Sequence, residues 1–324
     1  MTDRRGFLLA GALAALVPQW VTAQSRQAKI GILAPQPLEQ SAYAPGLVQR
    51  LAELGYREGA GARIHYRSAD GLVERYPMLV EDLVERGCEL FFALETEHPL
   101  RALRAARVHA PVVFLAADYD PVERGVISTM RTPDGNRTGV FIPQIQLAIR
   151  RVQFMREVVP DGRNFLLLTD PYSHGQVDAV RRAADGMRLD LTVVEFMKRP
   201  YDYAGAIDAG LKAEVEALIA LSSPAFQADA SVIAGLAARR RLPSAGDAAA
   251  MAHAGFLMTL GADVPRVSQR IAEIGARVLK GARTAEIPVE QADRFELVVN
   301  AAAARALGRQ LPEPVMARAD RVLS

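Results

Sequence analysis

Short apolar runs alternate with longer segments of helical periodicity along most of this chain. The first helical segment, residues 43–54, places Leu47 and Leu51 on one face and stops at Gly55, a residue that suits the left-handed backbone after a helix. In this first part of the chain, strands are expected at residues 29–34, 63–67, 89–94 and 111–116. Strands that alternate with crossover helices predict a parallel sheet covered by helices.

A turn-rich stretch at residues 131–136 interrupts the alternation, which then restarts. The later strands are expected at residues 165–169, 191–196, 217–221 and just after Pro243. The pattern therefore predicts an α/β fold with two doubly wound parallel-sheet lobes. A strand at 256–260 and an amphipathic helix at 264–279 follow, and we expect the chain to have returned to the first lobe by then.

The N-terminus has the pattern of an export signal. Arg4 and Arg5 precede an apolar run at residues 8–17, and the small residues at 21–23 form a cleavage pattern. The run is roughly half the ~20 residues that a membrane-spanning helix needs. We therefore expect cleavage after Ala23 and a soluble periplasmic protein. The paired arginines favour the twin-arginine route, with ordinary Sec export as the alternative.

Composition excludes several classes of function. A formal net charge of +2 does not indicate a nucleic-acid-binding protein. The single cysteine, Cys88, cannot form an internal disulfide and is expected to be a buried apolar residue. The five histidines lack metal-site spacing, and no phosphate-binding loop or nucleophile elbow is present. We therefore expect no metal and no cofactor.

Several sequence strings resemble one family when their order and spacing are taken together. They span residues 51–59 (LAELGYREG), 120–122 (DPV), 133–140 (PDGNRTGV), 295–300 (FELVVN), 305–308 (RALG) and 317–320 (ARAD). Together they resemble the ABC-transporter substrate-binding proteins of the tryptophan-uptake type. The resemblance extends over nearly the whole chain that follows the export signal.

The resemblance implies a type I periplasmic binding protein, in which two lobes joined by three crossings hold a ligand in the cleft between them. It also implies an ABC permease and its ATPase as partners, and we expect a monomer. On this basis the first lobe spans residues 24–141 and is completed by about 255–290. The second spans 142–254 and is completed by about 291–324.

Candidate ligand-binding residues lie just after the expected strands, because ligands of open parallel sheets bind beyond the carboxyl ends of the strands. They are Gln36, Glu95, Thr96, Asp118, Tyr172, Ser222, Ser223 and Asp247. Six of them have a structural alternative. Thr96 and the two serines can cap the following helices, Tyr172 can pack on its own lobe, and the side chains of Gln36 and Asp247 can be solvated.

Glu95 departs from the family, which more often has glycine before the threonine or serine at this point. Glu95 and Glu97 flank Thr96 and would repel an anionic group. The pair therefore favours a cationic or ammonium-bearing ligand over a carboxylate at this position.

The leading hypothesis is a periplasmic binding protein that closes over a small organic solute, such as an amino acid or a related compound, and carries out no catalysis. One alternative is an exported enzyme that uses Asp118 or Glu95 as an acid or base. Another is a ligand sensor that docks on a membrane receptor. Fold alone does not separate these three classes.

Overall fold

The structure is a computed structural model that describes residues 27–117, 119–131, 133 and 135–324. The predicted export signal and Asp118 lie outside these residues. Within the described ranges, no helix has both the length and the apolar character needed to cross a membrane.

The first lobe contains a six-stranded sheet in the order β11-β5-β4-β3-β1-β2, in which every neighbouring pair is parallel. Its strands are β1 (Ala28–Ala34), β2 (Ala62–Ser68), β3 (Leu90–Ala93), β4 (Val112–Ala116), β5 (Arg137–Phe141) and β11 (Glu290–Gln291). β3 and β4 are buried along their whole length, as expected for parallel strands covered on both faces.

Helices cover both faces of this sheet. They are α1 (Ala44–Glu53), α2 (Tyr76–Glu85), α3 (Glu97–Ala105) and α10 (Val264–Leu279), with short 3-10 turns at Val73–Arg75 and Thr284–Glu286. Leu47 of α1 and Ile271 of α10 belong to one apolar cluster, whereas Val80 of α2 and Leu100 of α3 belong to another. Cys88 is also buried in the second cluster, as the sequence predicts.

The second lobe contains a seven-stranded sheet in the order β13-β12-β10-β9-β8-β6-β7. Its strands are β6 (Asn164–Thr169), β7 (Asp190–Glu195), β8 (Ala217–Ala220), β9 (Ser244–Gly246), β10 (Met258–Ala262), β12 (Phe295–Asn300) and β13 (Arg321–Leu323). Its helices are α4 (Gln144–Val158), α5 (Val177–Gly186), α6 (Tyr203–Lys212), α7 (Pro224–Ala228), α8 (Ala230–Arg239), α9 (Ala249–His253), α11 (Ala301–Ala306) and α12 (Glu313–Ala317), with a 3-10 turn at His174–Gln176.

One sequence prediction about this lobe is wrong. The segment at 255–262 was expected in the first lobe, but β10 pairs with β9 and β12 in the second sheet. The sheet is mainly parallel, as predicted, but β12 runs antiparallel to β10. The cause is topological. The chain leaves the second lobe at the end of β10, forms α10 and β11 in the first lobe, and re-enters the second lobe from that same side as β12, so β12 runs opposite to β10.

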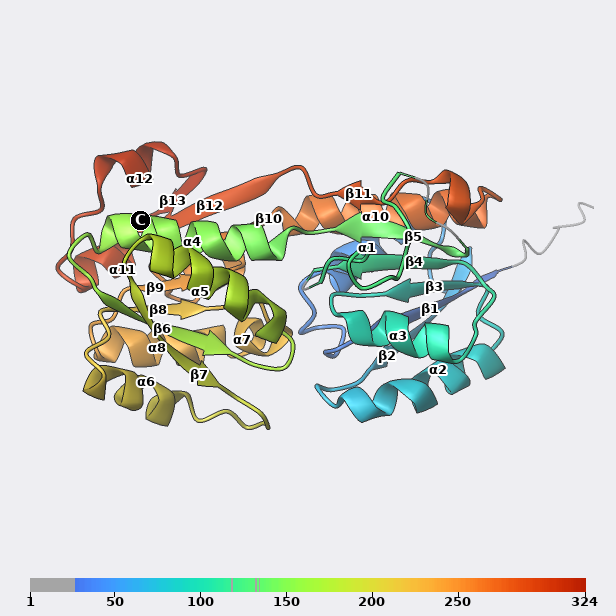
Figure 1. Ribbon diagram of the computed structural model, residues 1–324. Coiled ribbons are helices and arrows are strands. Elements are labelled where there is room, and N and C mark those ends of the chain that lie inside the picture. The colour runs from blue at the N-terminus through green and yellow to red at the C-terminus, as the bar shows by residue number, and fades with distance from the viewer. Residues whose placement is uncertain (1–26, 118, 132, 134) are drawn as a thin grey trace, which may run out of the picture.

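Three crossings join the lobes (Figure 1). They lie between β5 and α4 at residues 142–143, between β10 and α10 at Asp263, and between β11 and β12 at residues 292–294. The second and third crossings run side by side, and the backbone N–H of Asp263 donates to the carbonyl oxygen of Arg294 over 3.1 Å. The connection between the lobes is therefore narrow and contains little regular structure of its own.

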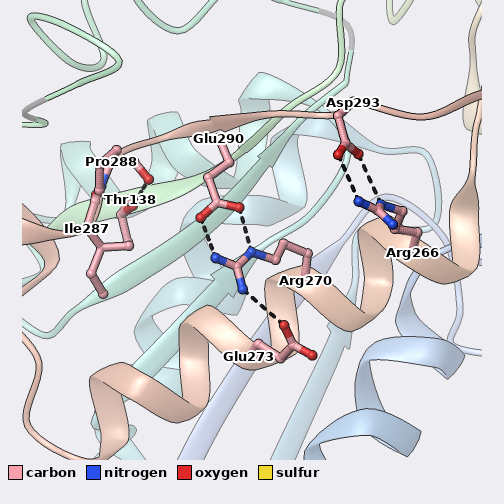
Figure 2. Close-up of polar contacts among 8 residues, drawn as sticks. All are labelled: Thr138, Arg266, Arg270, Glu273, Ile287, Pro288, Glu290 and Asp293. Atoms are coloured by element: carbon pink, nitrogen blue, oxygen red, sulfur yellow. Dashed lines mark hydrogen bonds and ion pairs between the residues drawn. The ribbon is translucent and has the colours of Figure 1, made fainter.

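Arginines of α10 hold the third crossing (Figure 2). Arg266 forms a bidentate pair with Asp293, with N···O distances of 3.0 and 2.8 Å. One turn further along, Arg270 binds both carboxylate oxygens of Glu290 over 2.5 and 2.6 Å and also contacts Glu273 over 3.0 Å. These pairs tie the chain to α10 on the first-lobe side of the crossing.

Candidate functional site

The site lies where strand ends of the two lobes face each other. Glu95 and Thr96 follow β3 in the first lobe, and Ser222 follows β8 in the second. All three line one small cavity together with Tyr43, Ala117, Pro224 and Gln227. The volume of this cavity is about 10 Å³. That is room for about one water molecule, so the two lobes are nearly in contact here.

Glu95 is the acidic group that the first lobe contributes. It is 4% exposed and adopts a backbone φ of 72°, in the left-handed region that favours glycine. The hydroxyl of Ser41 donates to its Oε1 over 2.7 Å. Burial, reinforced by the Asp247 carboxylate and opposed by the Ser41 hydrogen bond, raises the pKa of Glu95 to about 7.

Asp247 is the acidic group that the second lobe contributes. It follows β9 and is 4% exposed. Its Oδ2 accepts hydrogen bonds from Ser222 Oγ over 2.6 Å and Gln227 Nε2 over 2.8 Å, whereas its Oδ1 has no partner among the described residues. Burial raises the pKa of Asp247, although the positive charge of Arg151 opposes this shift. One of the two oxygens of this buried carboxylate, Oδ1, is therefore available to a ligand.

Arg151 of α4 is the counter-charge, and it is completely buried. Its Nη2 donates to Gln144 Oε1 over 2.5 Å, but its Nε and Nη1 lack hydrogen-bond partners within the described part of the chain. Burial lowers the pKa of Arg151 to about 10, against the attraction of Asp247. The two side chains interact electrostatically but form no direct ion pair with each other. A buried guanidinium with free N–H groups suits a ligand carboxylate.

Three hydroxyl candidates have different roles. The side chain of Thr96 makes no capping hydrogen bond at the start of α3, and its Oγ1 lacks a described partner. Ser222 donates to Asp247 at the cavity, as given above. Ser223 instead caps α7 through Ala225 N over 3.1 Å and donates to Asp170 Oδ2 over 2.5 Å. The structure therefore brings Thr96 and Ser222 together but gives Ser223 a structural role.

Tyr172 reaches the opposite lobe. Its ring meets His98 of α3 edge-on, with centroids 5.7 Å apart, and His98 stacks on Tyr76 at 6.3 Å. The alternative that Tyr172 packs only on its own lobe is therefore wrong. Gln36 is buried, and its backbone carbonyl oxygen accepts a hydrogen bond from Tyr66 Oη over 2.6 Å. Its side-chain Nε2 has no partner among the described residues.

Glu97, which was expected to face the ligand beside Glu95, lies elsewhere. Its carboxylate oxygens are 3.5 Å from Arg101 Nη1 and 3.9 Å from Arg124 Nε. It does not line the cavity between the lobes. Only one of the two acids that flank Thr96 therefore lines this cavity.

Sequence reasoning missed Arg151 and its partner Gln144. A signal was present, because Arg151 occurs on the helix face that also carries Leu147, Val152 and Met155, all of which are buried. A charged residue on an apolar helix face is rarely buried without a partner. That pattern marks a position where a buried charge needs a partner.

Comparison with known proteins shows the family and the fold of this chain. Residues 36–323 match the family model of the ABC transporter substrate binding proteins. A curated relative, the "Tyrosine-binding protein" of Clostridioides difficile, is 23% identical over 301 residues, which cover 89% of this chain and 83% of the relative.

Two solved structures have the same fold. A conserved domain protein from Vibrio cholerae has a TM-score of 0.83 at 22% identity, covering 92% of this chain and 100% of the other. An ABC domain in complex with L-Trp from Streptococcus pneumoniae has a TM-score of 0.80 at 23% identity, with 92% and 100% coverage. These likenesses confirm the predicted two-lobed α/β fold. Because the family model matches most of its length, the chain belongs to the family of ABC transporter substrate-binding proteins.

Proposed function

We propose that this protein captures a small amino-acid-like solute between its lobes and delivers it to an ABC permease and its ATPase. The observation that carries the proposal is the buried and partly unpaired charge at one place between the lobes. Glu95 comes from the first lobe, and Asp247 and Arg151 come from the second. The names of the relatives, one binding tyrosine and one in complex with L-Trp, support the same ligand class.

The charges match the two ends of a zwitterion. A ligand ammonium group can donate to the free Oδ1 of Asp247, and a ligand carboxylate can accept from the free N–H groups of Arg151. Each contact would satisfy a buried polar group that otherwise carries a desolvation cost. An amino acid therefore has the functional groups that this site lacks.

Binding requires the lobes to move. A cavity of about 10 Å³ cannot hold an amino acid, so the cleft must open for the ligand to enter. The three narrow crossings provide the place for bending. A ligand that contacts Glu95 on one lobe and Asp247 on the other favours the closed arrangement over the open one. Closure would present the two lobes to the permease in one fixed orientation.

The location follows from the same proposal. The paired arginines and the apolar run at the N-terminus support export to the periplasm, where substrate-binding proteins of this kind meet their ligands. No step of the proposed role requires covalent chemistry.

A thermal-melt screen of the protein with amino acids, polyamines, nucleosides and small carboxylates tests the proposal. A ligand at a hundred times its Kd should stabilise the protein by about 2.7 kcal/mol and should be recovered unchanged. Asp247→Asn should abolish or strongly weaken binding, while the matched control Asp208→Asn, which alters an exposed carboxylate of α6 paired with Arg240, should retain it.

Two results would contradict the proposal. Binding of none of these compounds would remove its basis, and chemical conversion of a bound compound would favour the enzyme alternative. Stimulation of the permease ATPase by the liganded protein tests the delivery step.

A further inference from the structure

The site contains more buried acidic groups than basic ones. Glu95 and Asp247 are two carboxylates, and Arg151 is the guanidinium that interacts with Asp247. The tyrosines around Glu95, namely Tyr43, Tyr66 and Tyr76, have pKa values raised mainly by burial and remain neutral. A zwitterion held by Asp247 and Arg151 therefore leaves Glu95 without a cationic partner.

The two lobes divide these charges between them. Asp247 and Arg151 both belong to the second lobe, so the zwitterionic head of an amino acid can bind there before the cleft closes. Glu95 belongs to the first lobe and meets the ligand only on closure. The Ser41 hydroxyl that donates a hydrogen bond to Glu95 is uncharged, so it does not balance the negative charge of the carboxylate.

On the basis of the proposed function, we propose that the preferred ligand is an amino acid with a second cationic group, which Glu95 binds when the lobes close. Asp247 and Arg151 hold the ammonium and carboxylate of the ligand head, and Glu95 accepts hydrogen bonds from the side-chain cation. A ligand with a net charge of +1 makes the buried cluster electrically neutral. A neutral amino acid requires Glu95 to bind a proton instead.

The experiment compares ligands that differ only in this charge. L-lysine and L-2-aminoheptanoic acid, which has a methyl group in place of the ammonium, form one pair. 4-(Aminomethyl)-L-phenylalanine and 4-ethyl-L-phenylalanine form a second pair with the aromatic bulk of the ligands named for the relatives. Kd values are measured by calorimetry at pH 8. In at least one pair the ammonium member should bind about tenfold more tightly or better, the range expected for a charge-assisted hydrogen bond.

Two variants assign the effect to Glu95. Glu95→Gln preserves the shape of the side chain and the acceptor for Ser41, and it should bring the ratio of the two Kd values close to one by weakening binding of the ammonium member of the pair. Glu97→Gln removes the neighbouring acid that pairs with Arg101, and it should leave the ratio unchanged. Circular dichroism confirms that both variants are folded.

A second measurement tests whether ligand binding releases a proton from Glu95. At pH 7 the cationic member should release protons as it binds, because it favours ionised Glu95, and the enthalpy should therefore vary with the buffer. Glu95→Gln should lose this release. Equal or tighter binding of the neutral member in each pair that binds would overturn the inference and leave the proposed function intact. Failure of all amino acids to bind would overturn both.

Discussion

Replacing Glu95 should change how the unliganded protein responds to pH. The ordinary pKa of a glutamate is 4.5, and burial between the lobes raises that of Glu95 to about 7. A raised carboxyl pKa means that the folded state binds the proton more tightly than the unfolded state does. Its contribution to stability is therefore fully present below pH 4.5 and is lost as the pH rises through 7.

The magnitude follows from the two pKa values. Each pKa unit corresponds to 1.36 kcal/mol, so ionisation of Glu95 should lower the unfolding free energy by about 3 kcal/mol between pH 4 and pH 8. Glu95 is 4% exposed, so solvent screening reduces this figure little. Glu95→Gln cannot ionise and avoids the loss. The unfolding free energy of the variant should exceed that of the wild type by a growing amount across this range.

Urea unfolding followed by far-ultraviolet circular dichroism measures both curves. Asp170 and Asp247 also have pKa values raised by burial, but they are present in both proteins and largely cancel in the difference. Glu97→Gln serves as the control and should follow the wild type. If the difference between Glu95→Gln and the wild type stays constant from pH 4 to pH 8, the carboxyl does not titrate as argued and the reasoning is refuted.

Three further predictions concern the residues around Glu95. Arg151→Met should weaken binding of a free amino acid about thirtyfold or more but leave that of its methyl ester unchanged; equal loss for both would contradict carboxylate binding. Tyr172→Ala removes the contact with His98 in the other lobe and should raise the ligand dissociation rate measured by stopped flow. Tyr201→Ala is the control, because Tyr201 stacks on Phe196 within the second lobe, and it should leave that rate unchanged. Asp293→Asn should change Kd by less than about fivefold, because its pair with Arg266 is exposed; a larger change would indicate control of closure.

Much of the fold could be predicted from local pattern. Buried strands such as β3 and β4 and the amphipathic helix α10 have periodicities that depend only on which faces are covered. The place of β10 could not be predicted in this way. An apolar strand of five residues fits either sheet, and its partner β12 lies about forty residues later in the sequence, beyond the reach of any local pattern.

The prediction of the site was incomplete for a similar reason. The rule that ligands bind beyond strand ends leads to Glu95, Thr96, Ser222 and Asp247, which the structure places together. It cannot find Arg151, which lies in the middle of α4 and interacts electrostatically with Asp247. The rule also selected Ser223, because a loop serine that caps a helix and one that faces a ligand occupy the same sequence position.

Glu95 is unfavourable for stability in two independent ways. Its φ of 72° lies where a residue with a Cβ costs roughly 1 kcal/mol or more, and glycine would avoid that cost. Its buried carboxylate costs a further amount of about 3 kcal/mol when ionised at pH 8. Neither cost is recovered within the first lobe, where Ser41 supplies a single neutral hydrogen bond. Residues that carry such costs concentrate at functional sites, and a cationic ligand would offset the larger of the two. The residue that strains the loop therefore also adds a negative charge to the cleft, and this links the conformation of one residue to the choice of ligand.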